Sequence, residues 1–351
     1  MTRPIPFLSD PVPFLSDNAA PVHPAIWDAM RAADEADSPY DGDALSQQLD
    51  ERFSDLFGRD CAALWVATGT AANCLALATM VQPHGGVVCH AEAHIEADEG
   101  GAPGFYLHGA KLILCADGHG GEGAKLTPNQ IAATIDPIRD DVHQVQPHAI
   151  AITQASEYGR AYRREELAEL ADFAKTRGLG LHMDGARFAN AAAFLGGSAK
   201  DAARAAAHGV DSLAFGFIKN GAMGAEAIVL FDPEQADLVR YRRKRSGHLQ
   251  CKGRYLAAQI LAMLDNDLWL DNARAANDAA QAIARGCGED RLMHEVDANE
   301  LFVKLTSQER EALRGQGFAF YDWGAEAARF VTAWNTREDD ATALGRAIVA
   351  L

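Results

Sequence analysis

The sequence predicts an α/β fold in which helices wrap a mostly parallel β-sheet, with a smaller α+β domain at the C-terminus. Short apolar runs alternate with helical stretches through the first two thirds of the chain, as expected for a parallel sheet covered on both faces. The runs at 178–183 and 210–218 are bounded by turn residues and rich in apolar side chains. Such short runs favour strands buried in a parallel sheet over helices.

The N-terminal third begins this alternation. Apolar side chains recur at helical spacing over 44–57, and Gly58 follows as a C-terminal stop. The segment 62–66 predicts a strand, and the turn after it leads into an expected helix over 71–81. We expect the helix over 44–57 to serve the structure only.

The middle of the chain continues in the same way, with short apolar runs separated by helical stretches. The runs predict strands at 86–89, 111–115, 149–153 and 225–231, and the stretches predict helices at 128–138 and 165–177.

The pattern changes beyond Gly253, where long helical stretches precede strand-like segments. This change predicts a large domain over 14–252 and a small domain over 253–351. The small domain is expected to hold helices at 254–265 and 268–285 and strands at 300–305 and 329–334.

Composition excludes several classes of protein. A formal charge of −17 over 351 residues argues against a nucleic-acid partner, and the basic cluster at 240–245 is expected to be a solvated helix face. Six cysteines without CxxC spacing indicate neither a zinc site nor a disulfide scaffold. The N-terminus lacks the apolar segment of a signal peptide, and the uncharged stretch 61–81 carries polar residues in its middle. We expect a cytoplasmic protein with no membrane partner.

The chemistry predicted from the sequence rests on Asp184 and Lys219, which end two of the expected strands. In open α/β sheets the ligand crevice lies beyond the carboxyl ends of the strands, so both side chains are expected to project into one crevice. A carboxylate and an amine there suggest pyridoxal phosphate, with Lys219 forming the Schiff base and Asp184 pairing with the pyridine nitrogen. The structural alternative is a helix-capping aspartate and a solvated lysine.

The residues around this pair carry a family resemblance. His-Met-Asp-Gly-Ala-Arg-Phe-Ala-Asn at 182–190 and Phe-Gly-Phe-Ile-Lys-Asn-Gly at 215–221 resemble the aspartate and lysine motifs of the L-threonine aldolases, which are pyridoxal enzymes of fold type I. The resemblance runs from about Phe14 to the C-terminus. It implies a lyase that cleaves a β-hydroxy-α-amino acid, such as threonine, allo-threonine or phenylserine, into glycine and an aldehyde. It also implies a homodimer or homotetramer.

The resemblance further implies roles for individual residues around the cofactor. Gly69, Thr70 and Asn73 match the family's Gly-Thr-x-x-Asn pattern, and a glycine turn before a helix N-terminus suits a phosphate. His94 is assigned to stacking on the pyridine ring, near the scissile bond.

Other residues are assigned to the substrate. Arg187 and Arg329 would hold the substrate carboxylate with a bidentate guanidinium, and Arg329 lies in a segment that resembles the family's C-terminal arginine motif. Arg187 is also assigned to the cofactor. Ser16 would assist them or simply cap a helix. Tyr40 lies in a loop that in relatives reaches a neighbouring subunit's site.

The sequence departs from the family at two places. Many members carry a phosphate-binding arginine where this chain has 246–252, so Arg245 or Lys252 is offered as a substitute. Many also have a histidine near the substrate hydroxyl where this chain has Glu157. Glu157 is therefore either the general base or an orienting partner of a water, or it pairs with Arg160, Arg163 or Arg164 on a solvated turn.

Two rival functions stay open at this point. A pyridoxal enzyme could instead catalyse β-elimination or transamination. A metal-dependent hydrolase would use His90, His94, His182 and Asp184, because helical spacing would place His90 and His94 on one face. Against that rival, the glutamate of the metalloprotease pattern is misplaced, and we expect no metal.

Overall fold

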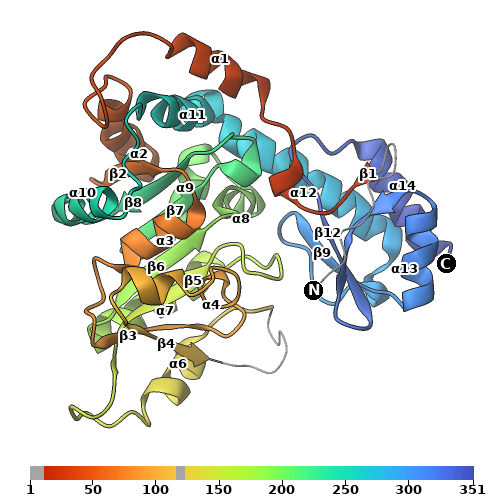
Figure 1. Ribbon diagram of the computed structural model, residues 1–351. Helices are drawn as coiled ribbons and strands as arrows, with labels where there is room; N and C mark the ends of the chain where they lie inside the picture. The colour runs from red at the N-terminus through yellow and green to blue at the C-terminus, as the bar shows by residue number, and fades with distance from the viewer. Residues whose placement is uncertain (1–11, 116–122) are drawn as a thin grey trace.

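The computed structural model describes residues 12–115 and 123–351 (Figure 1). A seven-stranded sheet forms the larger unit, with strand order β2-β8-β7-β6-β5-β3-β4. All neighbouring strands run parallel except at β8, which is antiparallel to both β7 and β2. The prediction of a mostly parallel sheet is confirmed. The strands are β2 (Ala62–Val66), β3 (Gly85–His90), β4 (Lys111–Cys115), β5 (Gln146–Thr153), β6 (Gly180–Gly185), β7 (Ser212–Gly216) and β8 (Glu226–Leu230).

Helices cover both faces of this sheet. Successive strand residues point to opposite sides, and because both sets are apolar, each face is buried under helices. On β2, Trp65 packs into the main core, whereas Leu64 and Val66 pack on the opposite face. The main-core face is covered by α2 (Leu49–Phe57), α6 (Pro128–Ile135), α7 (Arg164–Arg177), α8 (Phe188–Leu195), α9 (Ala199–Ala206) and α11 (Arg254–Leu264). The opposite face carries α3 (Gly69–Leu77), α4 (His94–Ala97), α5 (Ala102–Tyr106) and α10 (Ala236–Arg245).

The smaller unit is built on a three-stranded antiparallel sheet in the order β11-β12-β9. Figure 1 shows α12 extending from the large unit into the small one. Strand β1 pairs with β10 of the small unit, so residues 12–13 lie beside the C-terminal part of the chain. The remaining elements are β1 (Val12–Pro13), α1 (Pro24–Ala32), α12 (Leu268–Cys287), β9 (Glu300–Lys304), α13 (Ser307–Gly315), β10 (Phe318–Ala319), β11 (Tyr321–Trp323), β12 (Ala327–Val331) and α14 (Glu338–Val349).

The two cores divide within α12. Residues of α11 and the first part of α12, up to Ala273, pack into the main core. The second core begins at Ala279 and includes Phe14 from the N-terminal segment. The division into 14–252 and 253–351 stays a prediction. In the part of the chain that the structure describes, no helix combines the length and apolarity needed to cross a membrane.

Local contacts correct two of the expectations. The helix expected at 71–81 starts earlier, at Gly69, because Thr68 caps it by accepting a hydrogen bond from the Ala71 N–H. The basic cluster at 240–245 is only partly a solvated face. Arg243 is fully buried, donates to the Trp65 carbonyl and pairs with Asp41. A run of basic residues in the sequence does not reveal that one of them buries both its aliphatic stem and its charge.

Candidate active site

Asp184 and Lys219 lie at the ends of neighbouring strands, as the sequence predicts. Asp184 is the fifth residue of β6, and Lys219 lies in a short 3₁₀ turn, η3 (Ile218–Asn220), directly after β7. Within residues 12–115 and 123–351, the Lys219 amine has no hydrogen-bond or ion-pair partner. Burial, followed by the nearby Arg187 charge, lowers the pKa of Lys219. A lysine with a lowered pKa holds more of the neutral amine that acts as a nucleophile.

Asp184 is held by a chain of buried hydrogen bonds. Its Oδ2 accepts from Asn73 Nδ2 at 2.7 Å, and its Oδ1 accepts from the Ala186 N–H at 2.9 Å. The side-chain Oδ1 of Asn73 lies 3.0 Å from His182 Nε2, and His182 Nδ1 lies 2.8 Å from the Ser212 hydroxyl. Burial lowers the pKa of His182 to about 4, so this imidazole is neutral at physiological pH. The network fixes the carboxylate while leaving it further acceptor capacity.

Glu99 is a site residue that the sequence interpretation missed. Its side chain is fully buried, and its Oε1 meets both His94 Nδ1 and Asn73 Nδ2 at 3.0 Å. The hydrogen bond to Glu99 raises the pKa of His94. Glu99 thus orients the His94 ring and favours its charged form. Asn73 links Glu99 to Asp184 through the two protons of one amide.

Glu157 lies inside the site and not on a solvated turn. Its Oε1 accepts from the Thr153 hydroxyl at 2.6 Å and from the His94 N–H at 3.1 Å. Its Oε2 is buried and has no hydrogen-bond partner among the described residues. Burial raises the pKa of Glu157 to about 7.

The alternative pairing of Glu157 with a neighbouring arginine is wrong. Arg160 pairs with Glu295 and Asp297, and Arg163 pairs with Asp297. The Glu157 carboxylate therefore keeps Oε2 available to a new donor. Its pKa of about 7 suits proton transfer near pH 7.

Arg187 and Arg329 meet at a third residue that the sequence did not single out, Glu300. Arg187 forks onto Asp17 through Nε at 2.8 Å and Nη2 at 3.0 Å, and its Nη1 lies 3.0 Å from Glu300. Arg329 Nε lies 3.5 Å from the other oxygen of Glu300, outside hydrogen-bond geometry. Asn299 also donates to Asp17 at 3.0 Å. Arg187 thus has protein carboxylates on both sides, whereas the Arg329 Nε has no hydrogen-bond partner within residues 12–115 and 123–351.

Glu226 holds the turn that carries Lys219, and the sequence interpretation did not predict it. It opens the antiparallel strand β8, where its two oxygens accept from the backbone N–H groups of Phe217 at 3.0 Å and Ile218 at 3.3 Å. These peptides directly precede Lys219. Burial raises the pKa of Glu226 to about 8. The carboxyl therefore fixes the turn that carries the amine.

The N-terminus of α3 is the candidate anion site. Thr68 satisfies the N–H of Ala71, while the N–H groups of Gly69 and Thr70 find no acceptor among the described residues. The helix packs on β6, β7 and β8, beside the strands that position Asp184 and Lys219. Free N–H groups and the helix dipole favour a phosphate there. An unpartnered amine, a fixed carboxylate and this anion site together fit pyridoxal phosphate.

The remaining predicted residues have contacts of a different kind. Ser16 accepts from the Asn18 N–H at 3.2 Å and so caps a 3₁₀ turn, η1 (Asp17–Ala19), which packs against η3. Tyr40 lies under the Lys244 amine, 4.9 Å from its ring centre, and its N–H donates to Cys251. Arg245 lines a cavity of about 260 Å³ beside Leu75 and Ala78, toward the other end of α3 from Gly69. Lys252 is exposed.

The expected geometry of the metal rival is wrong. His90 ends strand β3 and His94 begins helix α4, so no single helix presents both. His182 uses both ring nitrogens within the protein. The group that the structure brings within 4.8 Å is instead His94, Glu99 and Asp184, at the centre of the site described above.

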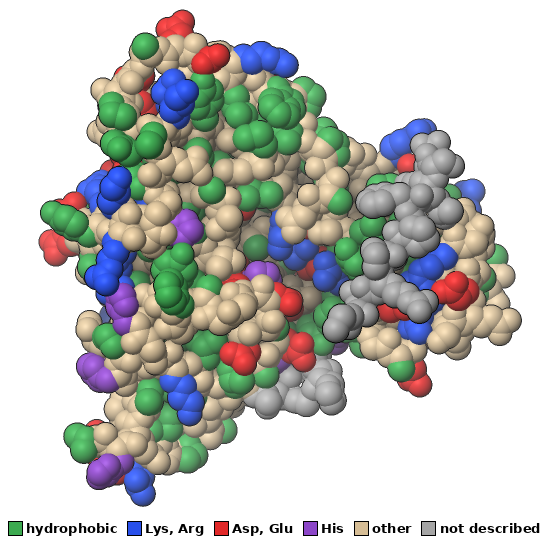
Figure 2. All heavy atoms as spheres, in the orientation of Figure 1, with side chains coloured by type: hydrophobic (Ala, Val, Ile, Leu, Met, Phe, Trp, Pro, Cys, Tyr) green, Lys and Arg blue, Asp and Glu red, His purple; other side chains and the backbone are tan. Residues whose placement is uncertain are grey.

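Figure 2 shows a hollow between the large and small units in which basic, acidic and histidine side chains gather.

Known proteins resemble this chain over nearly its whole length. The family model described as Beta-eliminating lyase matches residues 13–308. A low specificity L-threonine aldolase of Pseudomonas aeruginosa is 40% identical over 337 residues, which cover 95% of each chain. Another, from Pseudomonas sp. strain NCIMB 10558, is 38% identical over 92% of each chain. The solved threonine aldolase of Leishmania major has the same fold, with a TM-score of 0.87, 24% identity, and coverage of 96% of this chain and 98% of that one.

Proposed function

The chain belongs to the threonine aldolases of the β-eliminating lyase family, and we propose that its substrate is a β-hydroxy-α-amino acid of the threonine, allo-threonine or phenylserine type. It is a pyridoxal-phosphate-dependent lyase of fold type I, which yields glycine and an aldehyde by aldol cleavage. The observation that supports the assignment in this molecule is the placement of Asp184 and Lys219 at the ends of adjacent strands.

The cofactor would be held by residues of the large unit. Pyridoxal phosphate, when bound, supplies an electron sink for the carbanion left at the substrate Cα. Lys219 would hold it covalently, and Asp184 would accept a hydrogen bond from its ring nitrogen. Gly69 and Thr70 would donate to its phosphate. His94, oriented by Glu99, would stack on its ring.

The substrate carboxylate would be bound between the two units. In the part of the chain that the structure describes, the Arg329 Nε makes no hydrogen bond and lies 3.5 Å from Glu300. Arg187 donates one Nε and one Nη2 proton to Asp17, and its Nη1 lies 3.0 Å from Glu300, so a second Nη2 proton is left for a further acceptor. We therefore propose that Arg329 and Arg187 share the carboxylate, with the Ser16 hydroxyl beside them. Two guanidinium groups would hold the carboxylate and so fix the orientation of the substrate Cα–Cβ bond.

Glu157 is the proposed general base for the β-hydroxyl proton. Its Oε1 is fixed by Thr153 and by the His94 N–H, which leaves Oε2 as the oxygen available to a new donor. A substrate hydroxyl that donates to Oε2 would satisfy that buried oxygen. The carboxylate then takes the proton as the Cα–Cβ bond breaks.

Product analysis separates this function from its rivals. The purified protein with pyridoxal phosphate is expected to convert L-threonine or L-allo-threonine to glycine and acetaldehyde in equal amounts, and phenylserine to glycine and benzaldehyde. Formation of a keto acid with ammonia would indicate β-elimination. Amino transfer to a keto acid would indicate an aminotransferase.

We also propose that the protein works in the cytoplasm as a homodimer or homotetramer. All six cysteines are free, and five are buried, which suits a reducing compartment. Sedimentation equilibrium of the active enzyme tests the oligomeric state, and an active monomer would remove Tyr40 from the proposed site.

A further inference from the structure

The loop that carries Glu157 is a tight turn held through its neighbours. The Ser156 N–H donates to the Arg160 carbonyl at 2.8 Å, and the Gly159 N–H donates to the Ser156 carbonyl at 2.8 Å. The Ser156 hydroxyl donates to the Gly123 carbonyl and accepts from the Arg160 N–H at 3.3 Å. Glu157 therefore sits in a ring of hydrogen bonds that closes at Arg160.

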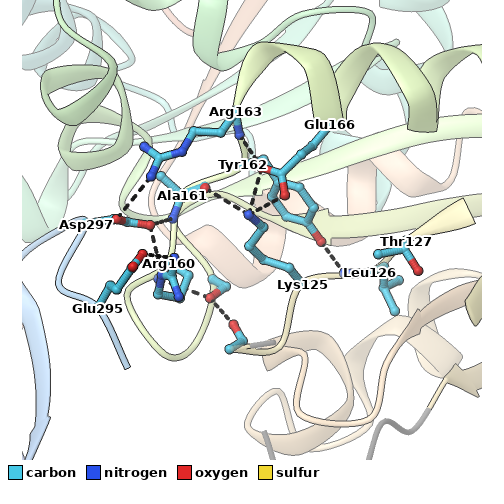
Figure 3. A network of polar contacts seen from close by, with 12 residues as sticks. Lys125, Leu126, Thr127, Arg160, Ala161, Tyr162, Arg163, Glu166, Glu295 and Asp297 are labelled. Carbon is cyan, nitrogen blue, oxygen red and sulfur yellow. Dashed lines mark hydrogen bonds and ion pairs between the residues drawn. The ribbon is translucent and has the colours of Figure 1, made fainter. Parts of the chain in front are cut away.

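Arg160 is anchored in turn to the small unit, and Figure 3 shows the network. Its Nε lies 2.9 Å from Asp297, and the same carboxylate accepts from the Ala161 N–H at 3.0 Å and faces Arg163 at 3.5 Å. The Asp297 side chain is 3% exposed. Arg160 also pairs with Glu295 at 2.7 Å, but that carboxylate is 77% exposed. Two acidic residues thus hold one arginine, one from inside and one from the surface.

A second contact holds the other side of Glu157. The ring of Tyr158 lies 5.0 Å from Phe302 and 5.6 Å from Trp323, on β9 and β11 of the small unit. The segment that begins at Asp297 also reaches Glu300, which faces Arg187 and Arg329. One short stretch of the small unit therefore contacts both the loop of the proposed base and the proposed carboxylate-binding arginines.

From this geometry we propose that Asp297 is a positioning residue, which acts through Arg160 and Ala161 to hold Glu157 in the dry site and so links the placement of the small unit to proton transfer. The proposal rests on the role of Glu157 proposed above. Asp297 itself touches neither the cofactor lysine nor Asp184. Its effect is indirect, because the buried state of Glu157 depends on the position of its loop.

Loosening of the loop that carries Glu157 should lower the pKa of this carboxyl. Among the described residues, the titratable groups that face Glu157 are Asp184 from β6 and Cys89 from β3, and the backbone N–H of His94 on α4 donates to it. Desolvation is the largest cause of the raised pKa of Glu157. A loosened loop admits water, so this pKa falls toward its ordinary value while Asp184 stays where it is.

The test compares Asp297→Asn with Glu295→Gln, a matched control that removes the exposed partner of the same arginine. The asparagine amide carries no charge but keeps an acceptor for the Ala161 N–H, so the fold should persist. We expect the acid limb of the kcat–pH profile to move to lower pH by about one unit in Asp297→Asn, with kcat at pH 8 reduced about fivefold and KM changed less. Glu295→Gln should match the wild type.

Two further variants keep the outcome decisive. Arg160→Gln breaks the same contact from the large unit and should shift the acid limb in the same direction, whether or not Asp297→Asn folds well. Asp297→Glu, which keeps the charge, should shift the limb less than Asp297→Asn. If the acid limb stays in place while activity falls only with the folded fraction, Asp297 is merely structural and the inference is overturned. If Glu157→Gln leaves kcat unchanged, the proposed base role fails instead, which is a separate result.

Discussion

Replacement of Glu157 by glutamine should lower kcat and remove the acid limb from the kcat–pH profile. The substitution keeps the size of the side chain and an oxygen for Thr153 and the His94 N–H, but removes the carboxylate that takes the β-hydroxyl proton. General-base help is typically worth about 10²–10⁴-fold, and a bound water can replace part of it. We therefore expect kcat for retro-aldol cleavage to fall at least about tenfold.

The pKa of about 7 gives this prediction a pH dependence. The Glu157 carboxyl is then about one tenth ionised at pH 6 and about nine tenths ionised at pH 8. The wild-type kcat should rise with pH through a midpoint near 7, and Glu157→Gln should lack that limb. The assay is kcat between pH 6 and 9 with threonine and with phenylserine, with Glu295→Gln as the control. Unchanged kcat with both substrates would refute the base role and return it to His94 or a bound water.

The same substitution has a consequence for stability, with a sign that can be worked out. The folded pKa of Glu157 lies above its ordinary value of 4.5, so the stability associated with the neutral carboxyl is fully present below about pH 4.5 and is lost as pH rises through about 7. At about 1.4 kcal/mol per pKa unit, the loss is of the order of 3 kcal/mol by pH 8. Urea unfolding of the apoprotein should show Glu157→Gln gaining stability over the wild type between pH 5 and 8.

Three further substitutions test the groups around Lys219 and His94. Asp184→Asn should lower kcat more than it raises KM, since the carboxylate matters most where the carbanion forms; the opposite pattern in steady-state kinetics would indicate a binding role. Glu226→Gln places an amide against the N–H groups of Phe217 and Ile218, so it should weaken cofactor retention on dialysis. Since the pKa of Glu226 is raised to about 8, the variant should also gain relative stability as pH rises from 5 to 8, and a gain at acid pH instead would contradict its burial as a neutral carboxyl. Glu99→Gln should lower the pKa of His94 in an NMR titration of the apoprotein. An unchanged pKa would contradict the proposal that Glu99 raises the pKa of His94.

The sequence was sufficient for the sheet and for the central pair, because both depend on local patterns. Short apolar runs predicted the seven strands, and the rule that ligands lie beyond strand ends predicted that Asp184 and Lys219 face one crevice from the ends of their strands. The boundaries of α3 were less accurate, because a capping threonine sets the helix start and apolar periodicity does not report caps.

The supporting carboxylates could not be predicted in the same way. Glu226 lies on the antiparallel strand, where its partners are backbone N–H groups that carry no sequence signal. Glu300 reaches the site only because the small unit packs against the large one, and its contact with Arg187 spans more than a hundred residues. Glu99 had a weak signal, since it follows His94 by five residues in an acidic stretch, but only the fold shows which of those acids is buried.

The most direct test of the account is the site of cofactor attachment. The purified protein, supplied with pyridoxal phosphate, should be yellow, and borohydride reduction should bleach it while fixing one pyridoxyl group per chain. Peptide mapping by mass spectrometry should place that group on Lys219, and Lys219→Ala should fold normally, take up no label and lose turnover. A label on another lysine, or near wild-type cleavage of threonine by Lys219→Ala, would contradict the assignment of Lys219 and Asp184 as the catalytic centre.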